Sequence, residues 1–266
     1  MGVWRLDLEY EGTRYRGWQE QKNARTVAGE LRRALEEVLG SPVDLGGAGR
    51  TDAGVHALEQ VAHLRTQARF RPEKLLQEVN EQLPADIHLL SIRSAAERFH
   101  ARHSALTRSY VYQVSMRRTA LAKRFVWWVR RPLSLDAMRA AAALVAGKHD
   151  FAAFCEKPDE QTSTLVVVER CEVAREGDLV LVRIAASHFL WKMVRRLVGT
   201  LVEVGAGELA PDEIGKLLGG RASGAKPAEW TAPPSGLFLE RVIYPGDAPL
   251  GELRSAIPVP PAPGRS

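Results

Sequence analysis

Apolar and polar residues alternate along the first third of the chain in a way that predicts strands and helices in turn. Strict alternation predicts strands at 3–10, 57–66 and 87–92, with a shorter one at 43–46. A helical pattern begins after Thr26, a residue type favoured at helix N-caps, and ends at Gly40, a typical stop signal. A second helix is expected from Pro72 to about Leu83. This third of the chain therefore reads β-α-β-β-α-β.

The remaining chain mixes strands and helices in the same way. Strands are expected at 108–114, 124–130, 165–174, 179–185 and 237–244, and helices at 135–145, 189–201 and after Pro211. Glu176-Gly177-Asp178 closes the third and fourth of these strands into a hairpin. We therefore expect an α+β protein with an N-terminal half at 1–104, a C-terminal half at 105–247 and a flexible Pro-rich tail at 248–266.

Charge and composition point to an anionic partner. The formal net charge is +5, and the basic residues are 29 Arg and 8 Lys. Arginine binds phosphate through two parallel hydrogen bonds and stacks on bases, which suits a nucleic acid. A GC-rich genome or a thermophilic surface explains the arginine excess equally well. Two cysteines without a CxxC pair, no signal peptide and no long apolar run lead us to expect a cytoplasmic location and no membrane contact.

Residues 47–57 form a Gly-rich run around a single carboxylate, Asp52. Glycine lets the backbone approach a ligand closely, so such a loop presents Asp52. A dinucleotide fingerprint is disfavoured because Asp52 stands where its third glycine belongs, and no phosphate-binding GxxxxGK[ST] loop occurs. Neither an HExxH zinc motif nor a GxSxG serine nucleophile is present, and we expect no metal and no cofactor. From this local pattern alone, an Asx-turn or a helix cap remains the commoner use of such an aspartate.

The run Gly-Arg-Thr-Asp-Ala-Gly-Val-His-Ala at 49–57 resembles the signature of the tRNA pseudouridine synthase A family. Further blocks similar to the family's motifs occur in the family's order at 10–21, 80–87, 99–105, 108–112, 147–151, 193–199 and 233–237. The resemblance covers residues 3 to about 245 and leaves out the tail. Glu11, Ala28 and His103 depart from the usual residues, and none of them is the candidate nucleophile.

The resemblance implies an isomerase that converts uridine to pseudouridine in the anticodon arm of tRNA, at tRNA positions 38, 39 and 40. The glycosidic bond breaks, the uracil rotates, and its C5 joins the sugar, so no cofactor is needed. A carboxylate suits this chemistry because it can act covalently and then leave. Asp52 would be that nucleophile, acting on a uridine flipped out of its stack. Attack on the sugar, attack on the base, and initial loss of a sugar proton all remain open.

The family's motifs also assign roles to other residues. Arg195 would pair with Asp52 and keep it ionised, Tyr110 would stack on the target base and take part in proton transfer, and Leu237 would form an apolar wall. Tyr112 shares a strand face with Tyr110, and from spacing alone both could be core aromatics. Arg196 is expected at the surface. The expected RNA-contact residues are Arg50, His56, Arg14, Lys22, Arg102, Arg108 and Lys192, each weighed against an ordinary solvated role.

The resemblance further implies two ferredoxin-like halves whose antiparallel sheets join, with helices on one face and a cleft between the halves. Asp52 would come from the first half and Tyr110, Arg195 and Leu237 from the second. The family is homodimeric, and the apolar stripe that begins at Phe189 is a candidate dimer face. Three rivals stay open: a non-catalytic RNA-binding or tRNA-chaperone protein, a synthase with another RNA target, and a small-molecule enzyme.

Overall fold

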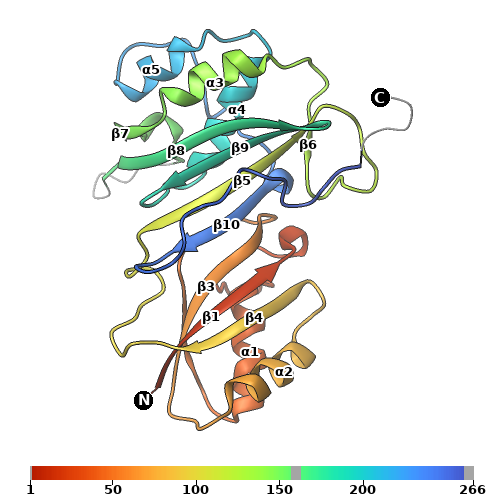
Figure 1. Cartoon of the computed structure of the whole chain (residues 1–266), viewed down its shortest axis with the longest axis vertical. Coiled ribbons are helices and arrows are strands. Elements are labelled where there is room, and N and C mark those ends of the chain that lie inside the picture. The colour runs from red at the N-terminus through yellow and green to blue at the C-terminus, as the bar shows by residue number, and fades with distance from the viewer. Residues whose placement is uncertain (1, 157–162, 261–266) are drawn as a thin grey trace. The chain divides into compact units, whose positions relative to one another are not determined.

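Two units make up the chain in a computed structural model that describes residues 2–156 and 163–260 (Figure 1). The first unit contains Met1–Leu106 and Phe238–Pro249, and the second contains Thr107–Leu237 and Leu250–Ser266. The strand expected near 237–244 therefore leaves the C-terminal half to which the sequence assigned it. This segment pairs in parallel with residues 56–57 of the first unit, a long-range contact that its late place in the sequence does not indicate.

The first unit is built on a mostly antiparallel sheet with the strand order β4-β1-β3-β10. Its strands are β1 (Gly2–Tyr10), β3 (His56–Thr66), β4 (Ile87–Ser94), β10 (Leu237–Ile243) and the short β2 (Asp44–Gly47). β2 pairs antiparallel with 62–65 of β3, whereas β10 pairs in parallel with 56–57 of the same strand. Because β2 and β3 pair as antiparallel neighbours, a loop joins them, and this loop carries Asp52.

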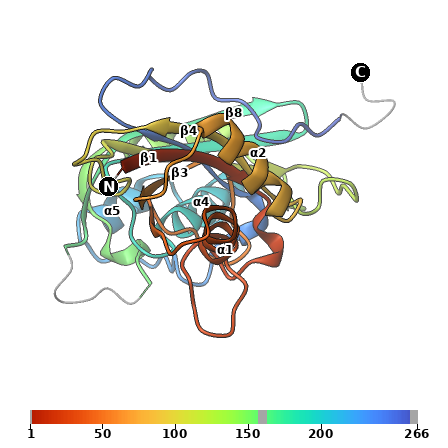
Figure 2. The same cartoon turned by 90° about the horizontal axis from the view of Figure 1, so that it is seen from below.

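Helices α1 (Val27–Leu39) and α2 (Pro72–Gln82) complete the first unit and pack against each other (Figures 1 and 2). The side chain of Thr26 accepts a hydrogen bond from the backbone N–H of Gly29 at 3.3 Å, and Gly40 ends α1 with a φ of +66°. Leu31 and Leu35 are fully buried on the apolar face. Local capping signals therefore predicted the helix, and burial of this face stabilises it.

The second unit has the strand order β5-β9-β8-β7. The strands are β5 (Thr107–Ser115), β9 (Leu179–Ala186), β8 (Leu165–Glu176), β7 (Gly147–Asp150) and β6 (Trp127–Trp128), which pairs with β5. The expected strand at 124–130 is thus reduced to two residues, and β7 was not expected. The sequence Gly-Lys-His-Asp of β7 carries no apolar alternation, so only its pairing with β8 makes it a strand.

The described part of the second unit contains the α-helices α3 (Leu135–Ala143), α4 (Met193–Gly205) and α5 (Asp212–Leu218). α3 packs against α4, α5 and β8 (Figure 1). The expected start of α4 near Phe189 was wrong, because Lys192 has a φ of +60° and the helix begins after it. A Cβ at Gly199 would lie 1.6 Å from the carbonyl oxygen of Trp230, so α4 passes against another chain segment there.

The apolar stripe of α4 is buried in the folded chain. Leu197, Val198, Leu201 and Val202 all have 0% exposure. The expectation that this stripe is a spare face for dimerisation was therefore wrong. Its width reflects a helix that is enclosed on nearly all sides.

Residues 250–260 make specific contacts with the second unit, contrary to the expectation of a flexible tail. The guanidinium of Arg183 on β9 is 1% exposed. It donates to the carbonyl oxygens of Gly251 at 2.9 Å and Glu252 at 3.0 Å, and it pairs with Glu172 at 3.1 Å. A buried guanidinium needs such acceptors, and the tail supplies two of them. The tail residues 261–266 lie outside the described residues.

Apolar contacts hold the same segment further along. Leu253 and Val259 pack on a buried cluster of Ala122, Val126, Leu179 and Leu181. The backbone N–H of Ile257 donates to the buried side chain of Gln113 at 3.0 Å. Composition suggested flexibility because proline-rich segments rarely form a core of their own, but this one uses the core of the second unit.

Removal of residues 250–266 is expected to lower the free energy of unfolding by about 3 kcal/mol, because two apolar side chains and the acceptors of Arg183 are lost. Thermal denaturation of the truncated chain measures the loss. Arg254→Ala, which changes a side chain of the same segment that is 79% exposed, is the control and should leave the melting temperature unchanged. A truncated chain that melts at the wild-type temperature would show that the contacts of 250–260 contribute nothing.

Candidate active site

Asp52 is the first residue of a tight turn in the loop between β2 and β3. The backbone N–H of Val55 donates to the carbonyl oxygen of Asp52 at 3.2 Å, and Gly54 has a φ of +79°. This is the conformation in which the third turn position favours glycine. Asp52 is half-buried, while the neighbouring Ala53 is exposed. The glycine therefore shapes a turn that presents the carboxylate at the end of the sheet.

A buried hydrogen-bond network holds the residues just before Asp52. The hydroxyl groups of Tyr10 and Thr51 lie 2.8 Å apart. The amide of Gln60, which is fully buried, donates to the carbonyl oxygen of Gly49 at 3.2 Å and to the Tyr10 hydroxyl at 3.4 Å. Burial raises the pKa of Tyr10 to about 12, so its hydroxyl stays neutral and able to donate. Both ends of the 49–51 segment are thus tied to the sheet.

The loop at 11–18 packs directly on the Asp52 loop. A Cβ at Gly12 would lie 1.9 Å from the carbonyl oxygen of Val55, and one at Gly17 would lie 2.3 Å from that of Thr51. Gly17 also has a φ of +93°. The backbone N–H of Trp18 donates to the carbonyl oxygen of Thr51 at 3.2 Å. The glycines of the 10–21 block are therefore explained by close backbone contact with the segment that carries Asp52.

The block at 80–87 supports the same loop from the other side. The Tyr15 hydroxyl donates to the carboxylate of Asp86, and the backbone N–H of Glu11 donates to the carbonyl oxygen of Asp86 at 2.9 Å. Burial and the Asp86 carboxylate raise the pKa of Tyr15. Asn80 exchanges two hydrogen bonds with the backbone of Leu89, at 2.8 and 2.9 Å, and so fixes α2 to β4. In the first unit, the 80–87 block thus holds the 11–18 loop, which in turn packs on the Asp52 loop.

Replacement of Tyr10 by Phe tests this network. The change removes one hydroxyl from a buried pair and should lower the free energy of unfolding by about 1–2 kcal/mol. If the network positions Asp52, turnover should fall more than this small destabilisation explains, measured well below the melting temperature. Every tyrosine is buried, so Ser94→Ala, which removes the hydroxyl of an exposed residue, serves as the control. Unchanged turnover in Tyr10→Phe would contradict the positioning role.

His56 is buried, with 1% exposure, although the sequence suggested it as a substrate contact. Its Nδ1 accepts a hydrogen bond from the backbone N–H of Gly12 at 3.0 Å, and its ring stacks on Phe238 at 4.8 Å. These contacts make His56 a support for the 11–18 loop. Nothing in the residues around His56 indicates that its side chain is buried, so the sequence alone suggested a substrate contact.

Three imidazole rings contact one another in the first unit. His100 lies between His63 and His103, at 4.3 Å from each between ring centroids and tilted by 49° and 50°. The Nδ1 of His63 accepts a hydrogen bond from the backbone N–H of Ala101 at 3.2 Å. Burial lowers the pKa of His63 from 6.5 to about 4, and the neighbouring charge of His100 adds to the effect.

This shift predicts a pH dependence of stability. The unfolded chain protonates His63 near pH 6.5 and the folded chain only near pH 4, so the unfolded state binds more protons between these values. The stabilisation is therefore complete above pH 6.5 and is lost as the pH falls toward 4, by up to about 2 kcal/mol. Urea denaturation from pH 4 to 8 measures it. In His63→Gln this part of the pH dependence should disappear, and a wild-type profile in that variant would contradict it.

Arg195 contacts the loop that leads into β10. Its Nε donates to the carbonyl oxygen of Ala232 at 2.7 Å, and its own carbonyl accepts from the N–H of Ala232 at 3.1 Å. The Tyr112 hydroxyl donates to the carbonyl oxygen of Pro233 at 2.7 Å. Burial raises the pKa of Tyr112, and the positive charge of Arg195 opposes that rise, so the two side chains are close. Arg195, Tyr112 and the segment before Leu237 are thus brought together in the second unit.

Tyr110 and Tyr112 are both buried, with 8% and 0% exposure. The ring of Tyr110 meets the ring of Phe189 edge-on at 5.0 Å. Leu237 is 4% exposed and follows Gly236, where a Cβ would lie 2.6 Å from the ring of Tyr112. Glycine at 236 is therefore required by the close approach of this loop to β5. The two tyrosines have different partners, which spacing alone did not reveal.

Arg196 was expected at the surface, and that was wrong. It is 7% exposed, donates to the carbonyl oxygen of Cys155 at 2.5 Å and forms an ion pair with Glu156. Its neighbour Arg195 is half-buried. The helical pattern placed Arg195 at the border of the apolar stripe and Arg196 outside it, and only the contacts of Arg196 with residues 155–156 bury it.

The other basic residues expected to contact RNA fall into two groups. Four are exposed: Arg14, Lys22, Arg50 and Arg102. Arg108 and Lys192 are half-buried, and each has a protein partner. Arg108 donates to the carbonyl oxygen of Ser187 at 2.8 Å, and Lys192 pairs with Glu156 at 3.1 Å. Binding of phosphate by these two would therefore compete with an existing contact.

Within residues 2–156 and 163–260, no group of three or more His, Cys, Asp or Glu side chains is arranged to hold a metal ion. Over the same residues, no helix has both the length and the apolar character that crossing a membrane requires.

Comparison with known proteins agrees with the motif blocks. A family model described as tRNA pseudouridine synthase matches residues 8–104 and 141–245. A tRNA pseudouridine synthase A from Methylococcus capsulatus is 42% identical over 256 residues, covering 95% of this chain and 92% of that protein. Proteins of the same name from a Thermoanaerobacter species and from Aquifex aeolicus are 40% and 38% identical, covering 89% and 90% of this chain and 97% and 98% of their own lengths. The chain belongs to the tRNA pseudouridine synthase A family, and it is an enzyme of the isomerase class.

Proposed function

We propose that this protein isomerises uridine to pseudouridine in the anticodon stem-loop of tRNA, at tRNA positions 38, 39 and 40. Support comes from the family and from the names of its relatives, which act on tRNA. The excess of arginine and the net charge of +5 suit an RNA substrate. We also propose that the enzyme is cytoplasmic and homodimeric, as the resemblance implies.

Asp52 is proposed as the nucleophile. The observation that carries this is the turn at 52–55, which presents one half-buried carboxylate and is anchored by the buried bonds of Thr51. The carboxylate adds to the nucleoside, the C1′–N1 bond breaks, the uracil turns, and a C1′–C5 bond forms. The C5 proton leaves and N1 gains one, so the atoms balance and Asp52 is released unchanged. Attack at the sugar and attack at the base both satisfy this balance.

Other residues are proposed to serve that step. The target uridine leaves its stack before Asp52 reaches it, and the exposed Arg50 takes the vacated position or holds the flipped nucleotide. Tyr110 stacks on the uracil and takes part in moving the proton, while Leu237 forms an apolar wall. Arg195 keeps Asp52 ionised. We propose that the two units are ferredoxin-like halves with joined sheets, so that these side chains meet Asp52 in a cleft.

The decisive experiment uses unmodified tRNA transcripts. Incubation with the purified protein should yield pseudouridine at positions 38, 39 or 40, mapped by chemical modification and primer extension. Pseudouridine elsewhere in the tRNA would favour a synthase with another target. Tight tRNA binding without any pseudouridine would favour the binding-protein alternative and contradict the proposal.

A further inference from the structure

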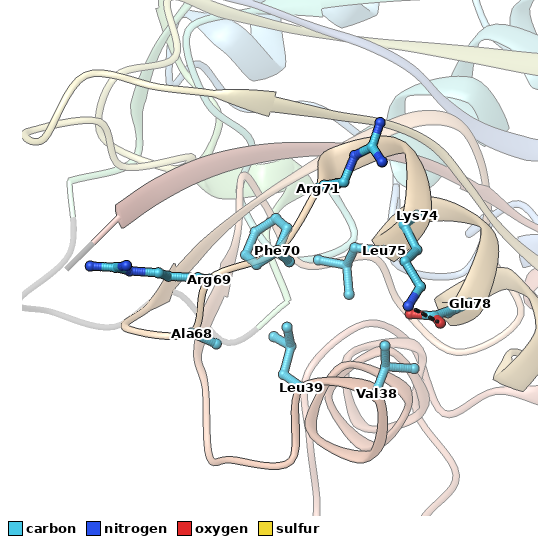
Figure 3. Close-up of a pocket in the computed structure, with 9 residues that line it drawn as sticks. All are labelled: Val38, Leu39, Ala68, Arg69, Phe70, Arg71, Lys74, Leu75 and Glu78. Carbon is cyan, nitrogen blue, oxygen red and sulfur yellow. Dashed lines mark ion pairs between the residues drawn. The ribbon is translucent and has the colours of Figure 1, made fainter.

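We propose that a hollow at the far end of the first unit is a second RNA-binding site, which takes one nucleotide of the tRNA outside the anticodon arm. The cavity has a volume of about 510 Å³, within the usual range for ligand sites. It lies between the end of α1 and the segment that leads into α2 (Figure 3). The identity of the RNA rests on the proposed function, whereas the site itself rests on the contacts described below.

One side of the hollow is apolar. Val38 and Leu39 come from the last turn of α1, and Phe70 and Leu75 face them from the opposite side (Figure 3). Phe70 is half-buried, and its ring contacts that of Trp4 at 4.7 Å between centroids, which holds it in place. A nucleobase can pack on such a surface whatever its sequence, because every base has an apolar face.

The rim of the hollow is positively charged. Arg69 and Arg71 are exposed, and within the described residues no hydrogen bond or ion pair engages their guanidinium groups. Lys74 differs, because it pairs with Glu78 at 3.3 Å (Figure 3). The guanidinium groups of Arg69 and Arg71 extend outward from the hollow (Figure 3), where they can bind the phosphate of a nucleotide whose base packs on the apolar floor. An apolar peptide would form no ion pair with Arg69 or Arg71, and free phosphate would make no contact with the apolar side of the hollow.

The distance from Asp52 decides which part of the RNA would reach this hollow. Asp52 lies four residues before β3, and the segment with Arg69 begins just after β3 ends at Thr66. Eleven residues of extended strand at ~3.3 Å each separate the two ends by about 35 Å. A nucleotide bound here is therefore remote from the reacting uridine, and the contact adds affinity for a long RNA without touching the chemistry.

The test uses the double variant Arg69→Gln with Arg71→Gln. Its dissociation constant for full-length tRNA should rise roughly tenfold, and the slope of log K against log salt should shrink by about 1–2, one contact per lost charge. Affinity for an isolated anticodon stem-loop and the turnover at saturating tRNA should not change. Phe70→Ala should weaken the binding of full-length tRNA and leave the affinity for the isolated stem-loop unchanged. Its melting temperature is also measured, because the substitution removes the contact with Trp4.

A matched control removes the same two charges elsewhere, through Arg139→Gln with Arg175→Gln on the second unit, and should leave both affinities unchanged. Equal weakening of tRNA and stem-loop by the Arg69 and Arg71 changes would place these residues in the anticodon-arm contact and overturn the proposal. A change in sedimentation with no change in tRNA affinity would mean that a second copy of the chain covers the hollow, which also overturns it. The binding measurements do not depend on turnover. A protein that binds tRNA as expected here but forms no pseudouridine would therefore contradict the proposed function and leave the second RNA-binding site supported.

Discussion

Asp52→Asn is expected to reduce pseudouridine formation by at least roughly 10³-fold, because the amide cannot act as the nucleophile. The substitution keeps the size of the side chain, and the backbone carbonyl of Asp52 can still accept the hydrogen bond from Val55 in the turn at 52–55. The melting temperature and the dissociation constant for tRNA should therefore stay close to wild type. Single-turnover formation of pseudouridine on an unmodified transcript gives the rate.

Asp44→Asn is the matched control. Asp44 is also an aspartate at the β2–β3 region, but its side chain is 66% exposed and its pairing with Arg65 is long, at 3.7 Å. Its loss should leave the rate unchanged. If Asp52→Asn retains a rate similar to that of Asp44→Asn, Asp52 is not the nucleophile, whatever the fold of the loop.

Arg195→Ala is expected to lower kcat by about 10²–10³-fold while tRNA affinity changes much less. The proposed role is to keep a partly desolvated carboxylate ionised, and removal of one partner of such a pair costs about 3–5 kcal/mol. Each 1.4 kcal/mol in the barrier is about tenfold in rate. The same substitution breaks the bond from Nε to the carbonyl oxygen of Ala232, so part of the loss would come from movement of the 232–237 segment.

The conservative variant separates the two effects. Arg195→Lys keeps the charge but not the geometry at Ala232, and it should recover part of kcat. The control is Arg131→Ala, which should leave kcat unchanged. Arg131 pairs at 2.6 Å with Glu203, a residue on the same helix as Arg195. Equal losses of affinity and kcat in Arg195→Ala would mean that Arg195 binds RNA and does not act on Asp52.

Local signals predicted much of the secondary structure. Thr26 and Gly40 bound α1 because capping depends on a few neighbouring residues. Gly177, with a φ of +57°, closes the β8–β9 hairpin for a similar reason. The predictions failed where an element forms only by pairing with a distant segment of the chain. One example is β7, which has no apolar pattern of its own and is a strand because it pairs with β8. The prediction for the tail at 250–260 failed for the same reason, because the donor Arg183 and the apolar cluster that the tail contacts come from distant parts of the second unit.

In the candidate site, too, local features were predicted from the sequence and long-range contacts were not. The sequence by itself determined the turn that presents Asp52, because Gly54 and the flanking residues define its backbone, and the order of the motif blocks determined the family. Only the tertiary structure decided that Gly12 and Gly17 press on this turn, that His56 and Arg196 are buried, and that Tyr112 lies beside Arg195. The physical reason is that caps and turns are set by adjacent residues, whereas burial and hydrogen-bond partners depend on which distant segments the folded chain brings into contact.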